Sequence, residues 1–194
     1  MKAIGLLAAA LAALSLSACV SVKEPIGTST GYVNDPALRG TWLSVPDDGK
    51  APAYVHVLLN DDSTMTVIGV SQGNDKDKAS WGELSLTTVR LGSNHYMNVR
   101  EISEDGKPKD DNTAAAASIP LLYAIHADTL SLYSLDEKKV ADAIRAHRIE
   151  GTVEKTQFGD TVSITADGPH LDAALIKPDA AALFEPVMTL KRVK

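Results

Sequence analysis

The 194-residue chain has a single cysteine, few large aromatic side chains and no cluster of basic residues. With one thiol, no intramolecular disulfide can form, so the fold must be held together by its hydrophobic core. The formal net charge is −6, and an acidic chain without a basic patch argues against nucleic acid as a partner. Two tryptophans, two phenylalanines and five tyrosines leave little aromatic surface for lining an apolar pocket or anchoring a protein interface.

Catalytic and metal-binding motifs are also missing. The sequence has no Gly-x-Ser-x-Gly, no Ser-x-x-Lys and no glycine-rich phosphate loop. None of the five histidines has a second histidine or a cysteine within four residues, as a compact metal site would require. We therefore predict that the protein is not an enzyme and has no catalytic, cofactor-binding or metal-binding residues. The histidines are His56, His95, His126, His147 and His170.

Paired aspartates recur along the chain, and each pair falls in an expected turn. None belongs to a twelve-residue loop with a closing glutamate, which a calcium site of the EF-hand type would need. Aspartate is common in turns because its carboxylate hydrogen-bonds to nearby backbone amides. We interpret these pairs as solvated loop residues; they are Asp47-Asp48, Asp61-Asp62, Asp75/Asp77 and Asp110-Asp111.

The amino terminus carries the clearest signal. Lys2 precedes the apolar run 3–14, which is shorter than the ~20 residues of a membrane-spanning helix but fits the core of an export signal. The run ends at Leu16-Ser17-Ala18-Cys19, which resembles the bacterial lipobox. That resemblance implies cleavage before Cys19, a diacylglyceryl group on its thiol and a further acyl chain such as palmitate on its amino group. The alternative is an ordinary secreted protein with a spare thiol beside its cleavage site.

The resemblance to bacterial lipoproteins also implies a location. In enterobacterial lipoproteins an aspartate directly after the cysteine retains the protein in the inner membrane, and here that position holds Val20. We expect the lipoprotein processing and sorting machinery to deliver the chain to the periplasmic face of the outer membrane, anchored by lipid on Cys19. Two or three acyl chains would make that attachment essentially permanent.

Three regions are expected along the chain: a cleaved signal at 1–18, a flexible tether at 19–34, and one domain at 35–194. The tether is expected because 20–34 is rich in Ser, Thr and Gly and has no hydrophobic period, so it would reach ~20 Å. The connector 104–117 is charged and then alanine-rich, which is typical of a surface loop.

Within the domain, short β-branched or alternating runs separated by turn residues predict strands. Helical spacing appears twice: Ser134 and Glu137 form a possible capping box before the first helix, and Pro178 interrupts the second. The fold class is mainly β, an antiparallel barrel or rolled sheet of about 8–10 strands with two inserted helices, since closure removes exposed sheet edges. Strands are expected near 38–45, 53–60, 64–71, 83–91, 94–102, 119–126, 129–135, 149–156, 160–166 and 186–193, and helices near 136–148 and 169–184.

The start of this domain resembles the first signature of lipocalins. Residues 34–42 contain Gly40-Thr41-Trp42 with an asparagine a few residues ahead. In that family the tryptophan closes the floor of the barrel, and a basic residue of the last strand packs across its indole. The resemblance implies this role for Trp42 and offers Arg192 or Lys191 as the cation. The middle lipocalin motif, Thr-Asp-Tyr, is absent. The alternative is a tryptophan used simply as core.

Function is less constrained than fold. His56 and Tyr96 would line a cavity if their strand faces pointed inward, but partly exposed strand positions are the favoured interpretation. Trp81 follows a polar run, which predicts that it is partly exposed. We expect a binding or interaction role, with another envelope protein as the first candidate partner. Two alternatives stay open: a carrier of a small apolar ligand in a lipocalin-like cavity, and a structural envelope module.

Overall fold

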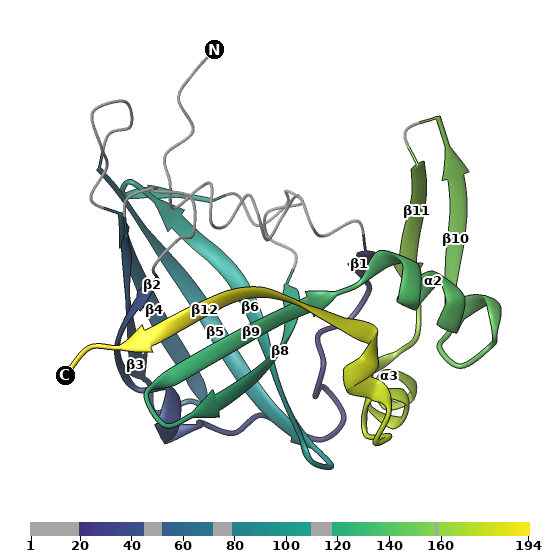
Figure 1. The fold of residues 1–194 in the computed structure, drawn as a ribbon, viewed down its shortest axis with the longest axis horizontal. Helices are drawn as coiled ribbons and strands as arrows, with labels where there is room; N and C mark the ends of the chain where they lie inside the picture. Colours follow the sequence, from purple (N-terminus) through teal and green to yellow (C-terminus); the bar gives the residue numbers. More distant parts are fainter. Residues whose placement is uncertain (1–19, 45–51, 72–78, 110–117, 158) are drawn as a thin grey trace.

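A computed structural model describes residues 20–44, 52–71, 79–109, 118–157 and 159–194. Within this part of the chain a closed antiparallel barrel stands beside a smaller group of strands and helices (Figure 1). The lipobox at 16–19 lies outside the described residues, as do three of the acidic pairs: Asp47-Asp48, Asp75/Asp77 and Asp110-Asp111.

Eight antiparallel strands form the barrel, in the order β2-β3-β4-β5-β6-β8-β9-β12, and β12 pairs back onto β2. The prediction of an antiparallel barrel with inserted helices is therefore confirmed. The two-residue strand β7 (Lys107–Pro108) pairs with the last residues of β6. The barrel strands are β2 (Gly40–Ser44), β3 (Ala53–Leu59), β4 (Thr64–Ser71), β5 (Ser80–Leu91), β6 (Asn94–Glu104), β8 (Ile119–His126), β9 (Thr129–Leu135) and β12 (Phe184–Arg192).

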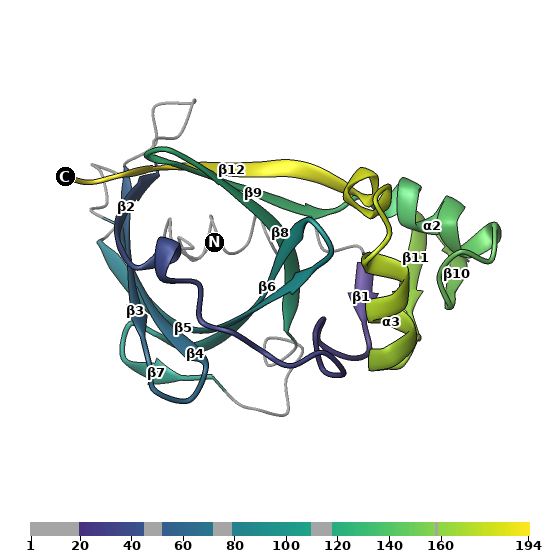
Figure 2. The same cartoon turned by 90° about the horizontal axis from the view of Figure 1, so that it is seen from below.

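The remaining elements pack against one side of the barrel wall, as the view along the barrel shows (Figure 2). Two of the expected strands, near 149–156 and 160–166, belong to this group rather than to the barrel, in a three-stranded sheet of order β1-β11-β10. The helix expected near 169–184 ends before Pro178 and resumes as a short 3-10 turn, η3. The group consists of β1 (Val20–Val22), β10 (Gly151–Thr156), β11 (Gly159–Ile164), α2 (Glu137–Arg145), α3 (Gly168–Leu175) and η3 (Ala180–Leu183).

Both helices begin at an aspartate that sequence periodicity did not single out. The carboxylate of Asp136 accepts the amide of Lys139 at the start of α2, and Asp167 accepts the amide of His170 at the start of α3. The capping box expected from Ser134 and Glu137 is therefore wrong. An aspartate one residue ahead of the helix satisfies the free amide equally well, while Ser134 stays in β9.

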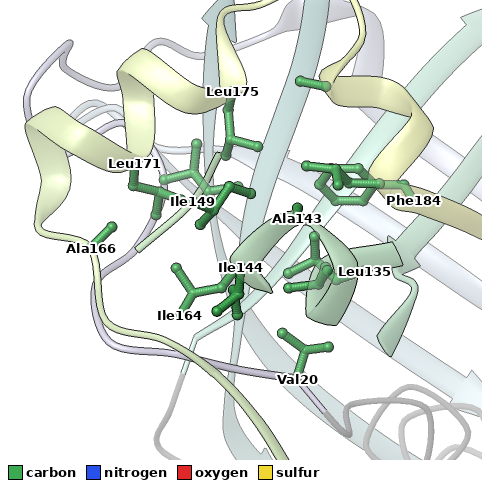
Figure 3. Packing of buried hydrophobic residues seen from close by; sticks show 14 of the residues in the cluster. Val20, Leu135, Ala143, Ile144, Ile149, Ile164, Ala166, Leu171, Leu175 and Phe184 are labelled. Carbon is green, nitrogen blue, oxygen red and sulfur yellow. The ribbon is translucent and has the colours of Figure 1, made fainter. Parts of the chain in front are cut away.

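Two hydrophobic cores result, one inside the barrel and one between its outer wall and the packed group. In the second core, Ile144 of α2, Ile164 of β11 and Leu171 of α3 point toward Leu135 and Phe184 of the barrel (Figure 3). Strands β5, β6 and β9 therefore bury apolar side chains on both faces, which a barrel standing alone in water would not do.

The segment 20–34, expected to be a flexible tether, is folded onto the domain. β1 pairs in parallel with β11 from Val20 onward. The side chain of Ile26 is 1% exposed, and both its backbone N–H and its C=O are hydrogen-bonded to the amide of Asn98. The buried carboxylate of Asp172 on α3 accepts the amide of Gly27 and the hydroxyls of Ser29 and Thr30. The tether prediction failed because Ser, Thr and Gly are also the residues that fold tightly around a buried carboxylate.

Candidate functional site

One end of the barrel is closed by the 3-10 helix η1 (Pro36–Leu38) and by Trp42 behind it. Trp42 is fully buried, and its indole Nε1 donates to the carbonyl of Leu38 at 2.8 Å. The guanidinium of Arg192, opposite Trp42 in the β12–β2 register, lies 4.0 Å from the centre of the indole ring. It also donates to the carbonyls of Arg39 and Ala37, so one side chain covers the tryptophan and holds η1 in place. We call this end the floor.

Between the floor and the opposite end, the barrel encloses a cavity of about 110 Å³. Because side chains alternate along a strand, every second residue of each strand faces this space. Apart from Ser44 and Gly69, the residues around it are aliphatic or methionine, so the space offers fewer polar side chains than an ordered water needs. Its lining comprises Leu38, Ser44, Ala53, Val55, Val57, Val67, Gly69, Leu84, Leu86, Met97, Val99, Leu121, Leu130, Leu132, Met188 and Leu190.

The end opposite the floor, which we call the mouth, is more polar inside. Ser71 and Ser80 pair across β4 and β5 in line with cavity residue Ala53, so both face inward. Both are buried, and their hydroxyls have no hydrogen-bond partner among the residues the structure describes. The amino group of Lys109 lies 2.8 Å from a carboxylate oxygen of Glu104 and 3.4 Å from one of Glu101. The hydrogen bond to Glu104 raises the pKa of Lys109, which keeps it charged.

His56 and Tyr96 do not line the cavity; both side chains are on the outer face of the barrel wall. The favoured interpretation, a partly exposed strand position, is confirmed for His56 and is wrong for Tyr96. Val55 and Val57 of β3 face the cavity, so His56 between them faces outward, half-buried, with its Nδ1 3.0 Å from the hydroxyl of Thr41. Tyr96 is fully buried in the outer core, where its hydroxyl donates to the carbonyl of Leu175. Burial raises the pKa of Tyr96 to about 12.

The other charged candidates are explained by local structure. Asp62 accepts the amide and hydroxyl of Thr64 in the exposed β3–β4 turn, so the pair Asp61-Asp62 is a solvated turn as predicted. These hydrogen bonds lower the pKa of Asp62. His170 pairs with Asp167 at the start of α3, which raises the pKa of the histidine. Across the described ranges, no three His, Cys, Asp or Glu side chains group closely enough to hold a metal ion.

A second hollow, of about 760 Å³, lies on the outside of the barrel between the β8–β9 wall and η3. At one end of it the hydroxyl of Tyr123 donates to Asp35 at 2.7 Å, and the Nδ1 of His95 lies 3.8 Å from the same carboxylate. Burial and the hydrogen bond to Asp35 raise the pKa of Tyr123, which stays protonated and donating. Because Asp35 also caps η1 through the amide of Ala37, this cluster fixes the floor of the barrel.

One half-buried and two exposed side chains form a row on the outer wall beside the mouth. Tyr54 of β3 is opposite Val70 of β4, which is opposite Trp81 of β5. Val70 and Trp81 are 37% and 43% exposed. The exposure expected for Trp81 is confirmed, and sequence alternation alone gave no sign that its neighbours would be apolar.

Together these features define a closed, floored antiparallel barrel with an apolar interior and a polar mouth. Comparison with known proteins finds no matching family model, no matching curated protein and no matching solved structure. A search of the described residues for a helix long and apolar enough to span a bilayer found none.

Proposed function

We propose that the protein is a lipid-anchored envelope protein whose barrel binds an apolar ligand, such as a hydrocarbon chain. The observation that carries this proposal is the cavity, which is apolar from Leu38 at the floor to Ala53 near the mouth. Apolar cavities of this order of size stay dry and take up apolar guests, because water gains too few hydrogen bonds inside them. This reverses the order of the sequence hypotheses, in which a protein partner stood first.

The scarcity of aromatic residues, which argued against a pocket, does not exclude one in this barrel. The cavity is lined by leucine, valine and methionine, whose flexible or branched side chains suit a narrow aliphatic guest. The unpartnered hydroxyls of Ser71 and Ser80 at the mouth would give a polar end of such a guest hydrogen-bond partners. An amphiphile with its chain toward the floor therefore fits the interior better than a purely apolar molecule.

The test compares two identical substitutions on one strand. Val67 lines the cavity and Val70, three residues on, faces outward, so Val67→Phe narrows the cavity while Val70→Phe leaves it unchanged. Benzene, an apolar guest small enough for this cavity, serves as the ligand, and its binding is measured by calorimetry. Circular dichroism verifies that both variants keep the barrel. We expect Val67→Phe to weaken binding roughly tenfold, a change of about 1.4 kcal/mol, and Val70→Phe to have no effect. Equal affinity of Val67→Phe and the wild type would place the binding elsewhere and refute the proposal.

The lipid anchor has its own test. Replacing Cys19 by serine should abolish incorporation of radiolabelled palmitate and either release the domain into the periplasm or leave the precursor uncleaved. Labelling that survives Cys19→Ser would contradict lipidation at this position. Fractionation of the wild type on a sucrose gradient should place it with outer-membrane markers, as expected from Val20.

The hollow beside β8 and β9 favours a second candidate, a protein partner. It is open, about 760 Å³ in volume, and combines Phe184 and Tyr133 with the polar edge of His95 and His126. Native mass spectrometry of the protein purified from its own envelope distinguishes the two candidates, because one leaves a small bound mass and the other a bound chain.

A further inference from the structure

We propose that the mouth of the barrel faces the lipid bilayer, with the row Tyr54, Val70 and Trp81 at the membrane interface. The inference rests on the proposed lipidation of Cys19 and deepens the proposed function. It identifies the lipid bilayer as the surface that the mouth end of the barrel faces.

The first support is the position of β1. Strand β1 begins at Val20, which is paired with Val162 of β11. Consecutive Cα atoms are 3.8 Å apart, so lipid carried on residue 19 would be attached one residue ahead of a strand in a sheet. With no slack between anchor and fold, the domain lies against the membrane in a defined orientation.

The direction of β1 determines which side faces the membrane. Figure 1 shows β1 running away from the end of the molecule where the mouth lies, so its first residue points toward that end. Strand β11 runs parallel to β1, so it also begins on the side of the mouth. The β10–β11 hairpin therefore extends toward the mouth end of the molecule (Figure 1). The floor, with η1 and the β3–β4 turn, lies at the opposite end.

The second support is the chemistry of the exposed row. Tryptophan and tyrosine concentrate at membrane–water interfaces, where the ring contacts acyl chains and the N–H or O–H reaches water. Trp81 is the second residue of β5, Tyr54 the second of β3, and Val70 the last but one of β4, so all three lie beside the mouth. Their exposed surface is unfavourable in water and favourable against lipid, at ~25 cal/mol per Å² of apolar area removed from water.

The chain contains only two tryptophans, which makes the test direct. The lipidated protein is reconstituted into phosphatidylcholine vesicles with or without dibrominated acyl chains, because bromine quenches indole fluorescence on contact. We expect brominated vesicles to abolish the emission of Trp81 and to spare that of Trp42, which lies buried at the floor. A Trp81→Phe variant, reporting Trp42 alone, should show no quenching.

A matched pair of variants tests the orientation further. Tyr54 and Leu58 face outward from the same strand, Tyr54 beside the mouth and Leu58, 50% exposed, toward the floor. In the Trp81→Phe background, Tyr54→Trp should restore quenching and Leu58→Trp should not. Both side chains lie on the outer surface, so neither change disturbs the barrel interior.

Each contrary outcome identifies what failed. Protein that sediments with vesicles while Trp81 stays unquenched, or in which Leu58→Trp is the quenched position, would overturn the orientation and leave the anchor intact. Failure to sediment would remove the anchor and the orientation together. In detergent without vesicles, Trp81 should stay equally exposed to solvent at every protein concentration. If its exposure falls as the protein concentration rises, a second copy of the chain covers the row, which also overturns the proposal. Binding of benzene to the cavity is measured separately, so loss of the cavity function is not confused with any of these results.

Discussion

Replacing Trp42 by alanine should be among the most destabilising single changes in this chain. The side chain is fully buried, and its removal leaves a hole between η1 and the cavity while taking away the hydrogen bond to Leu38. Deleting a buried large aromatic typically costs ~3–5 kcal/mol of unfolding free energy. Trp81→Ala is the control, and it should cost much less because Trp81 is 43% exposed and faces solvent on the outer wall. Urea unfolding followed by far-ultraviolet circular dichroism measures both, since that signal does not depend on tryptophan.

The same prediction has a second part, the coupling between Trp42 and Arg192. Arg192→Ala should cost about 2 kcal/mol, through the lost cation–π contact and because the carbonyls of Ala37 in η1 and of Arg39 just after it lose their charged donor. Because the two side chains touch, the double variant should lose less than the sum, with a coupling of ~0.5 kcal/mol or more. Lys191, which points away toward Thr129, should show no coupling with Trp42. Equal losses for Trp42 and Trp81, or additive losses for Trp42 and Arg192, would refute this description of the floor.

Three further predictions concern the elements packed beside the barrel. Asp172→Ala should cost about 2–3 kcal/mol, because the backbone and hydroxyl donors of 27–30 lose a buried charged acceptor, and hydrogen exchange should accelerate in that segment while the barrel stays protected. Gly151→Ala should cost about 1–3 kcal/mol in urea unfolding, since an added Cβ would lie 2.4 Å from the backbone oxygen of Ser163 and the two strands would have to separate. Burial raises the pKa of Tyr96 to about 12, above the value of about 10 in the unfolded chain, so its stabilising contribution is complete below pH 10 and is lost as pH rises to 12. Tyr96→Phe should therefore flatten the pH dependence of the unfolding free energy in that window, and an unchanged slope would contradict it.

The strands were predictable because alternation is strong wherever one face meets the barrel core. The strand near 64–71 was placed with the observed bounds of β4, and that near 119–126 with those of β8. The apolar pattern of β5 changes phase between Leu86 and Val89, and from the sequence alone a bulge at Thr87-Thr88 would account for the change. The register is continuous there; instead Leu86 faces the barrel core and Val89 the outer core. Predicting a strand from alternation assumes that only one of its faces is buried. The prediction fails where a second layer of structure buries the other face as well.

The folded amino-terminal segment was not predictable from composition. Its order depends on Asn98 and Asp172, which are far away in sequence and polar, so hydrophobic patterning gives them no weight. The side-chain amide of Asn98 bonds both backbone groups of Ile26: its Oδ1 accepts the N–H, and its Nδ2 donates to the C=O. A buried carboxylate such as Asp172 is conspicuous only once its position in space is known.

The floor of the candidate site could be predicted, and the cavity could not. The lipocalin resemblance singled out Trp42 and offered Arg192 or Lys191 as its cation, and Arg192 is the residue that stacks. Alternation separates the two faces of a strand, but it does not say which face lies inside the barrel. That depends on how the sheet closes. Alternation alone therefore left the cavity role of His56 and Tyr96 open, and the closed barrel shows that Val55 and Met97, not these two residues, face inward.

The packing of residues 20–34 connects the fold to the proposed membrane role. A free chain of that length would let the domain rotate within ~20 Å of its anchor, and the barrel would have no fixed relation to the bilayer. Here the buried Asp172 carboxylate on α3, the Asn98 amide on the barrel wall and the β1–β11 pairing tie the segment to the folded domain at three places. Each of these ties orders backbone at an entropic cost of about 1–2 kcal/mol per residue, which a mere spacer would not require. A lipid anchor on residue 19, with no spacer before β1, would fix the orientation of the whole domain. The proposed membrane orientation of the barrel would then depend on contacts between residues more than 70 positions apart in the sequence.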